Sequence, residues 1–318
     1  MFERVLVTGG LGLIGSHLTE RLVGLCKEVV ILDDASTGRL ENISNNKSSQ
    51  IRLVQGSVLD EKIVNLAFEK VDFCFHMAAS LGVKKILESP IESLNVNLEG
   101  SKNVFLAASK NKVPIFLAST SEIYGKSISQ PLSEISDRLL GSPLSIRWAY
   151  SEAKAIDETM AQMYAYEYGL EFVIGRFFNT VGPRQTGDYG MVLPRFVNSA
   201  IKNEDLEVYG DGEQTRVFCH VKDAVEAVLK LVQDKGLYGH VFNIGGNREI
   251  SIKGLAELVI QITGSKSKIK HVPYNEAYPR GFEEIYRRVP DTTKLKNSTG
   301  WKAEMSLEQT IKDIAKSI

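Results

Sequence analysis

The stretch Val5-Leu-Val-Thr-Gly-Gly-Leu-Gly-Leu-Ile-Gly15 decides the fold. A short apolar run leads into three glycines, Gly9, Gly12 and Gly15, and the apolar residues after them recur at helical spacing. This pattern predicts a strand, a tight turn and a helix, because glycine lets the chain reverse sharply and brings bare backbone N–H groups close to a pyrophosphate. The positive end of the helix favours the phosphate charge. The stretch therefore predicts a dinucleotide-binding site.

An acidic pair follows the second apolar run, 28–33. Asp33 lies 24 positions after Gly9, near the ~20 expected for an acid that accepts both hydroxyls of the adenosine ribose. Asp33 and Asp34 precede the first basic residue, Arg39, so a 2′-phosphate would meet negative charge. The pattern favours NAD over NADP; the alternative is a strand that ends in a solvated acid pair.

Composition excludes several classes of function. The chain has 318 residues, 43% of them apolar and 24% charged, which is enough for one large domain and a smaller lobe. Its net charge of −1 gives no general attraction to nucleic acid or to a membrane, so local arginines must hold any anionic ligand. The histidines form no HExxH or clustered pattern, and no metal site is expected.

The number of cysteines and the length of the apolar runs indicate the cellular compartment of the protein. The three cysteines are an odd number at no metal-binding spacing, which is typical of reduced thiols in a cytosolic protein. Apolar runs stay short of a membrane span, and the first strand is predicted to begin at residue 4, which leaves no room for a signal peptide. We expect a cytoplasmic protein.

The rest of the chain alternates between strand-like and helical patterns. Apolar runs suited to strands lie at 4–8, 28–33, 51–55, 72–77, 113–118 and 171–177. Helical patterns lie at 14–25, 61–69, 91–110 and 151–168. This alternation predicts an α/β fold with a doubly wound parallel sheet, a Rossmann fold.

The alternation loosens after residue 178, which indicates a second lobe. Long irregular stretches follow presumed strand ends, where open sheets bind ligands. Two amphipathic helices, 223–233 and 251–262, separate these stretches. We expect a NAD-binding domain at 1–178 plus about 213–263, and a substrate lobe at about 179–212 plus 264–318.

Tyr150 and Lys154 are spaced for proton chemistry. Positions i and i+4 share one helix face, so the ammonium can lie beneath the phenol. A free tyrosine has a pKa of about 10, and bringing it near 7 takes roughly 4 kcal/mol of phenolate stabilisation. Lys154 and the positive nicotinamide ring are expected to supply it. The Y-x-x-x-K spacing is common by chance and gains meaning from the dinucleotide-binding stretch upstream.

Polar residues follow the apolar run 113–117. Thr120 is placed to hydrogen-bond the hydroxyl that is oxidised, and Ser121 to contact the substrate. Glu122 is an acid where a structural turn would accept glycine or serine; the alternative for Glu122 is a helix-start or solvent-facing acid.

A set of motifs in fixed order runs through essentially the whole chain. They are Gly9-Gly-Leu-Gly-Leu-Ile-Gly15, Asp33, His76-Met-Ala-Ala79, Ser119-Thr-Ser-Glu122, Tyr150 with Lys154, Arg176-Phe-Phe-Asn-Thr-Val-Gly-Pro183, Tyr209-Gly-Asp-Gly212, Gln214-Thr-Arg216 and Arg287-Arg-Val-Pro-Asp291. Together they resemble the extended short-chain dehydrogenase/reductases that remodel nucleotide sugars. The resemblance implies that Tyr150 takes a proton from the sugar 4-hydroxyl as hydride passes to NAD, which gives a 4-keto sugar.

The resemblance and the glycine-rich stretch together assign contact residues. For NAD they are Gly9, Gly12, Leu13, Ile14, Gly15, Asp33, Asp34, Ser36, Thr37, Gly38, Val58, Ala78, Ala79, Tyr150 and Lys154. For the nucleotide sugar, with UDP favoured, they are Ser121, Asn179, Arg184, Val192, Leu193, Tyr209, Arg216, Arg287 and Arg288. One departure is Gly56-Ser57, where relatives commonly carry Gly-Asp, so the adenine contact falls to the Val58 backbone.

Residues after the threonine distinguish the reactions of this family. Thr120-Ser121-Glu122 resembles the UDP-glucuronate decarboxylases and also the GDP-mannose dehydratases. Two further stretches favour decarboxylation: 137–150 resembles the decarboxylase of aminoarabinose synthesis and plant UDP-apiose synthase, and Arg288 aligns with an arginine that those enzymes place beside the sugar carboxylate. The resemblance thus makes Thr120, Glu122, Tyr150, Lys154 and Arg288 the catalytic residues.

Alternatives stay open at this point. The reaction could be 4-epimerisation or 4,6-dehydration, and the chain could be a non-catalytic NAD-binding sensor, although such proteins usually lose the tyrosine or the lysine. The resemblance also implies a homodimer through helices 91–110 and 151–168, whose apolar positions are equally explained by packing on the sheet. The sequence does not disclose the base, the exact sugar or whether a 4-keto product is released.

Overall fold

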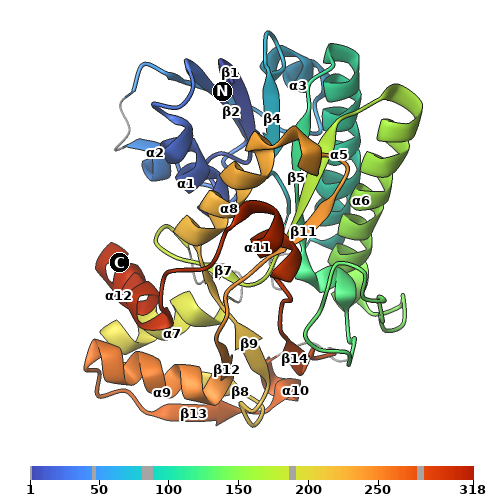
Figure 1. The fold of residues 1–318 in the computed structure, drawn as a ribbon. Helices are drawn as coiled ribbons and strands as arrows, with labels where there is room; N and C mark the ends of the chain where they lie inside the picture. Colours follow the sequence, from blue (N-terminus) through green and yellow to red (C-terminus); the bar gives the residue numbers. More distant parts are fainter. Residues whose placement is uncertain (1, 45–47, 81–88, 186–190, 278–282) are drawn as a thin grey trace.

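The computed structural model describes residues 2–44, 48–80, 89–185, 191–277 and 283–318 (Figure 1). Its centre is a seven-stranded parallel sheet with the order β11-β6-β5-β4-β1-β2-β3. The strands are β1 (Arg4–Thr8), β2 (Glu28–Asp33), β3 (Ile51–Gln55), β4 (Phe73–His76), β5 (Ile115–Thr120), β6 (Phe172–Phe177) and β11 (Val241–Ile244). This is the predicted doubly wound α/β fold.

Helices cover both faces of the sheet because its strands are apolar on both sides. One face carries α1 (Leu13–Leu22), α8 (Val221–Gln233) and α11 (Thr293–Thr299). The other face carries α3 (Glu61–Ala67), α5 (Pro90–Asn111) and α6 (Ala149–Tyr168). In β1, Val5 and Val7 face the first group and Leu6 the second, as the two-residue repeat of a strand requires.

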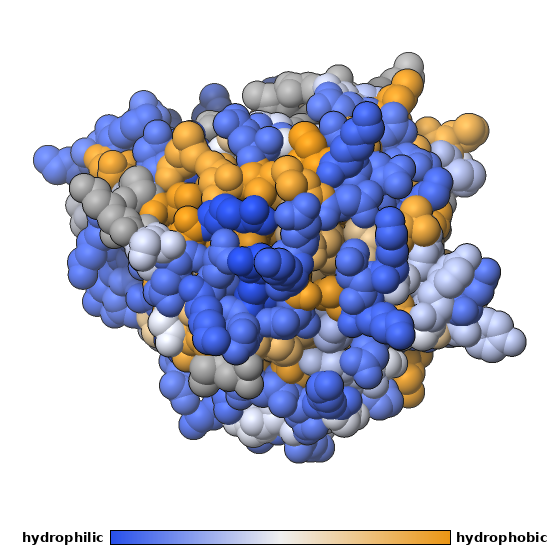
Figure 2. Space-filling model, turned by 90° about the horizontal axis from the view of Figure 1, so that it is seen from above, coloured by the Kyte–Doolittle hydropathy of each residue, from blue (hydrophilic) through white to orange (hydrophobic). Residues whose placement is uncertain are grey.

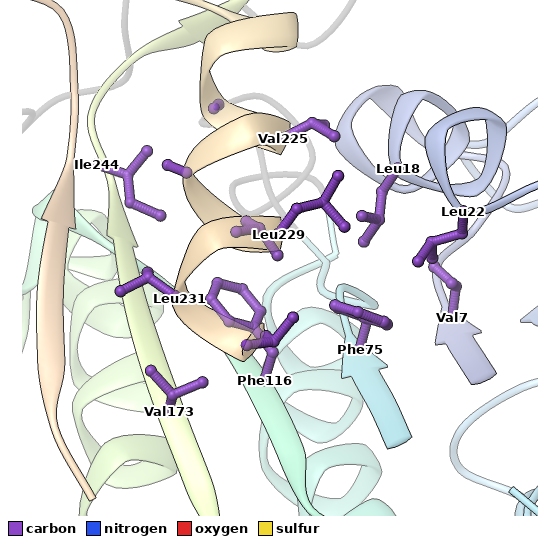
Figure 3. Close-up of a cluster of buried hydrophobic side chains, with 14 of the residues drawn as sticks. Val7, Leu18, Leu22, Phe75, Phe116, Val173, Val225, Leu229, Leu231 and Ile244 are labelled. Atoms are coloured by element: carbon purple, nitrogen blue, oxygen red, sulfur yellow. The ribbon is translucent and has the colours of Figure 1, made fainter. Parts of the chain in front are cut away.

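Figure 3 shows the core on the first of these faces, between α1, α8 and the sheet. Leu18 and Leu22 of α1 point toward Val7 and toward the side chains of α8. Burial of each such side chain contributes on the order of 1.5–3 kcal/mol. This packing fixes the helix that follows the glycine-rich turn, and with it the turn itself.

The predicted elements of the large domain are confirmed to within a few residues at their ends, and one strand was missed. β11 pairs with β6 from Val241↔Ile174 to Ile244↔Phe177 and completes the edge of the sheet. Its four residues follow a polar turn and give too short an apolar run to stand out in the sequence.

A smaller lobe packs below the sheet in the view of Figure 1. It contains α7 (Val192–Ile201), α9 (Ile252–Thr263), α12 (Leu307–Ser317) and the parallel pair β8 (Leu206–Tyr209) and β13 (Ile269–Val272), which share one apolar core. Short strands join the lobes: β7 (Thr180–Val181) with β10 (Cys219–His220), and β9 (Thr215–Val217) between β12 (Glu249–Ser251) and β14 (Arg287–Arg288).

Two segments pack in the other domain from the one expected. The helix predicted at 251–262 was assigned to the large domain, but α9 packs against α7 and α12. Conversely, Leu295 and Trp301 lie in the core of the large domain, although 264–318 was assigned to the small lobe. The amphipathic pattern showed that each segment had a buried face but not which core would bury it.

The remaining elements are short connections. They are α2 (Glu41–Ser44), α10 (Tyr274–Ala277) and the 3₁₀ turns η1 (Ser121–Tyr124), η2 (Ile146–Trp148) and η3 (Lys235–Leu237). The face seen from above in Figure 2 is largely hydrophilic, with groups of apolar side chains between the charged ones. Among the helices of the described residues, none is long and apolar enough to cross a bilayer.

Candidate active site

A cavity of about 480 Å³ opens at the carboxyl ends of the strands, between the sheet and the small lobe. The predicted cofactor residues that line it are Gly9, Gly12, Leu13, Ile14, Gly15, Asp33, Asp34, Ser36, Thr37, Gly38, Val58, Ala78, Ala79 and Tyr150. The predicted substrate and catalytic residues that line it are Thr120, Ser121, Glu122, Asn179, Arg184, Val192, Leu193, Tyr209, Arg216 and Arg288. Segments far apart in the sequence therefore meet in one cavity.

The glycine-rich turn forms a cradle that side chains would fill. Gly9 has a φ of +70°, and a Cβ there would lie 2.7 Å from the backbone nitrogen of Ala78. A Cβ on Gly15 would overlap the carbonyl oxygen of Gly9. Helix α1 begins directly behind this turn, so its positive end faces the cavity. The turn fits a pyrophosphate.

Asp33 ends β2 at the edge of the same cavity. Its carboxylate accepts hydrogen bonds from the backbone N–H groups of Leu11, at 2.9 Å, and Ala35, at 2.8 Å. Burial raises the pKa of Asp33, and the two backbone hydrogen bonds oppose that shift. These contacts hold the acid beside the glycine-rich turn, where the adenosine ribose of NAD is expected.

Tyr150 lines the cavity at the start of α6, and Thr120 ends β5 opposite it. Burial, followed by the charges of Glu122 and Asp157, raises the pKa of Tyr150 above its usual range. The nearby Thr120 hydroxyl opposes this shift because it favours the phenolate. Tyr150 therefore carries its proton in the ligand-free protein.

Lys154 is paired with an acid of its own helix. It is 1% exposed and does not line the cavity, and its ammonium donates to Oδ2 of Asp157 at 2.6 Å. The i,i+4 spacing puts Lys154 on the same face of α6 as Tyr150. Asp157, three residues after Lys154, forms an ion pair with its ammonium group.

Glu122 is bound between two arginines. Its Oε1 accepts a hydrogen bond from Arg288, and its Oε2 lies 2.6 Å from Nη2 of Arg147. Burial by itself would raise the pKa of Glu122, but the two guanidinium groups outweigh it and hold that pKa far below its usual range. Glu122 therefore stays charged, and the cluster carries a net positive charge.

Arg147 is a charged residue of the cavity that the sequence did not predict. It lies in η2, three residues before Tyr150, and lines the cavity with its guanidinium over the Trp148 ring, 5.2 Å from the ring centroid. The only signal in the sequence was a basic residue close to the tyrosine, and its direction depends on the 3₁₀ turn.

Four of the predicted substrate residues that line the cavity have partners within the protein. Nη2 of Arg288 donates to Oδ1 of Asn179 at 2.6 Å, which joins Asn179 to the Glu122 cluster. Arg216 pairs with Glu284 at 2.7 Å. Arg184 pairs with Glu20 of α1 at 2.8 Å, so its guanidinium lies on the cofactor side of the cavity.

Arg287 is the predicted substrate residue that the structure places elsewhere. Its guanidinium pairs with Glu249 of β12 at 2.7 Å and does not line the cavity. Successive side chains of a strand point to opposite faces, so only one of the two adjacent arginines in β14 can face the ligand. Arg288 faces it.

A buried network supports the strand ends beneath the site. Arg176 donates twice to Glu158, at 2.9 and 2.7 Å, and once to the hydroxyl of Tyr124 at 2.8 Å. Ser119 donates to Glu158 at 2.5 Å, and Tyr124 donates to Asn243 of β11 at 2.7 Å. This network connects β5, β6, β11 and α6.

Replacing Arg176 with methionine is expected to lower the free energy of unfolding by about 3–5 kcal/mol, because Glu158 would stay buried without its partner. Denaturant titration measures the loss. The matched control is Arg248→Met, which removes an exposed pair with Glu308 and is expected to cost about 0–1 kcal/mol. Equal effects of the two substitutions would contradict the role of the network.

Comparison with known proteins agrees with this geometry. The family model described as GDP-mannose 4,6 dehydratase matches residues 6–314. A relative from Bacillus cytotoxicus, "UDP-N-acetyl-alpha-D-glucosaminuronate decarboxylase", is 43% identical over 98% of this chain and 97% of its own length. "UDP-glucuronic acid decarboxylase 4" of Arabidopsis thaliana is 33% identical over 96% of this chain, which spans 66% of the plant protein's length.

A solved structure shares the fold with this chain. The UDP-glucose 4-epimerase of Thermus thermophilus, solved in complex with NAD, has a TM-score of 0.85 and 27% identity, and the match covers 99% of this chain and 98% of that one. The chain belongs to the GDP-mannose 4,6 dehydratase family of extended short-chain dehydrogenase/reductases. It is an NAD-dependent enzyme that modifies nucleotide sugars.

Proposed function

We propose that this enzyme decarboxylates a UDP-linked hexuronic acid. The observation that carries the proposal is the cluster of Glu122, Arg147 and Arg288, which places two guanidinium groups on one carboxylate beside Tyr150 and Thr120. Such a cluster can bind the carboxylate of a uronic acid, because guanidinium groups match carboxylates in shape and charge. The two decarboxylase relatives support the same reaction.

The sheet side of the cavity is assigned to NAD, and the side next to the small lobe to the nucleotide sugar. The turn from Gly9 to Gly15 would hold the pyrophosphate of NAD, and Asp33 its ribose. Bound NAD supplies reversible acceptance of the hydride from C4 of the sugar. Arg216 and Asn179 would hold the sugar diphosphate, while Val192, Leu193 and Tyr209 would enclose the base.

Tyr150 would act as the base of the oxidation step. It would accept the proton of the 4-hydroxyl while Thr120 orients that hydroxyl. The raised pKa of ligand-free Tyr150 means that it must lose its own proton once ligands bind, when the positive nicotinamide ring lies nearby.

The 4-keto product is a β-keto acid, because its carboxylate carbon C6 is bonded to C5, next to the ketone. The C5–C6 bond breaks, carbon dioxide leaves, and the electron pair forms an enolate between C4 and C5. Thr120 and Tyr150 would face the enolate oxygen, and a proton supplied by Arg288 or by solvent in the cavity would then add at C5. Glu122 is held charged between the two guanidinium groups in the ligand-free protein, and its charge would repel the substrate carboxylate.

Product analysis by NMR tests the proposal. The enzyme is incubated with NAD and either UDP-glucuronate or its 2-acetamido counterpart, the sugar in the name of the Bacillus cytotoxicus relative. We expect release of carbon dioxide and a UDP-linked pentose or 4-keto pentose from at least one substrate. A UDP-galacturonate product would show a 4-epimerase, and dehydration of a neutral hexose without reaction of either uronate would overturn the proposal.

We also propose that the enzyme is a homodimer in the cytoplasm. Helices α5 and α6 pack side by side and leave Ile91, Ile156 and Met163 exposed at 75%, 45% and 55%. These residues offer an apolar face for a second copy. The three cysteines are buried and unpaired, as expected where thiols stay reduced.

A further inference from the structure

A buried acid that the proposed chemistry does not use lies directly behind the cavity wall. Asp157 is 0% exposed, and it lies three residues after Lys154 on α6. Its Oδ2 accepts the hydrogen bond from the Lys154 ammonium, and neither side chain lines the cavity. Tyr150 does line it, one helical turn before Lys154.

The second oxygen of this carboxylate is poorly satisfied. Oδ1 of Asp157 has no hydrogen-bond partner among the described residues. Burial raises the pKa of Asp157, and Lys154 and the Ser101 hydroxyl of α5 oppose that shift because they favour the charged form. A buried charge with one unsatisfied oxygen is costly, so its retention requires a compensating role.

His76, which also lies behind the wall, adds no charge there. His76 hydrogen-bonds Ser101 at 3.1 Å and Thr8, at the end of β1, at 2.8 Å. Burial, helped by the charge of Lys154, lowers the pKa of His76 to about 3, so the imidazole is uncharged at physiological pH. Asp157 is therefore the group that balances the Lys154 charge.

Charged groups reach Tyr150 from two sides. From η1, η2 and β14 in front come Glu122, Arg147 and Arg288, which bind one another. From α6 behind come Lys154 and Asp157. The next residue of that helix, Glu158, is neutralised by Arg176 of β6.

We propose that Asp157 is a positioning residue: it tethers the Lys154 ammonium behind the cavity wall and, through its own charge, sets the pH at which Tyr150 ionises. The inference rests on the proposed function only for the role of Tyr150 as the base. Asp157 does not line the cavity. It therefore acts on proton transfer by Tyr150 only through Lys154 and through the electrostatic potential at the phenol. In the ligand-free protein, burial and the negative charges near the phenol raise its pKa and keep it protonated.

The test is a titration of Tyr150 in the ligand-free, full-length protein. Tyrosine labelled with ¹³C at Cζ reports ionisation by NMR, and Tyr150→Phe identifies the Tyr150 resonance. In Asp157→Asn the amide keeps the shape and one acceptor but loses the charge. We expect its Tyr150 resonance to begin shifting at a pH roughly one unit lower than in the wild type, the scale at which one neighbouring charge moves a pKa.

The matched control is Asp223→Asn. Asp223 is also largely buried and accepts hydrogen bonds from the backbone of Glu304 and Met305, remote from the cavity. The substitution Asp223→Asn is expected to leave the Tyr150 titration unchanged. Asp157→Ser is measured alongside as a second neutral variant, so that the result does not depend on the folding of one protein, and Asp157→Glu should restore the wild-type titration.

A second readout is the pH dependence of NADH formation at 340 nm with the substrate found to react. Its acid limb should move to lower pH in Asp157→Asn by the same amount as the NMR titration. An unchanged Tyr150 titration in both neutral variants overturns the proposal. A shifted titration in a protein that turns over no uronate refutes the proposed reaction and leaves the role of Asp157 intact.

Discussion

Replacing Tyr150 with phenylalanine is expected to lower kcat by about 10³-fold, within the range that a positioned general base contributes. The substitution removes the one hydroxyl that would accept the proton of the sugar 4-hydroxyl, in a cavity that Thr120 also lines. Phenylalanine keeps the ring that lines the cavity, so KM is expected to change little. Steady-state kinetics of carbon dioxide release, with absorbance at 340 nm for transient NADH, measure the effect.

The control for this substitution is Tyr166→Phe, on the same helix. Tyr166 is 91% exposed and remote from the cavity, so its loss of a hydroxyl should leave kcat unchanged. Retention of turnover in Tyr150→Phe within a few-fold of the wild type would contradict the assignment of the base, whichever sugar is the substrate.

Replacing Gly15 with alanine is expected to abolish NAD binding and to destabilise the fold by about 1–3 kcal/mol. The new methyl group would overlap the Gly9 carbonyl oxygen and lie 2.8 Å from its carbon atom. Both are backbone atoms of the tight turn and cannot rotate away. Helix α1 would have to move outward, which opens the packing of Leu18 and Leu22 shown in Figure 3.

Gly12→Ala separates the two effects. A Cβ on Gly12 would meet its nearest atom, the Gly9 carbonyl oxygen, at 3.4 Å, which is ordinary contact, so the fold should keep its stability. The methyl group would still enter the cavity where the pyrophosphate is expected. Denaturant titration and calorimetric titration with NAD distinguish the variants, and an undiminished affinity of Gly12→Ala for NAD would place the cofactor elsewhere.

Much of the site could be predicted from the sequence because its residues follow strand ends. Gly9, Asp33 and Thr120 each come directly after or at the end of an apolar run, and parallel strands bring such positions to one edge of the sheet. Neither the partner of Glu122 at Arg147 nor the partner of Lys154 at Asp157 could be predicted this way. The first pairing depends on how η1 and η2 come together, and the second on side-chain direction within one turn of α6.

By itself, the sequence determined the doubly wound sheet, the dinucleotide-binding turn and the presence of Thr120 and Glu122 beside Tyr150, because periodicity, glycine placement and strand ends are local properties of the chain. Tertiary structure decided which core buries α9, which of Arg287 and Arg288 faces the cavity, and which acid holds Lys154. These outcomes depend on contacts between segments distant in sequence or on the direction of single side chains. Burial and charge pairing settle them only once the chain has folded.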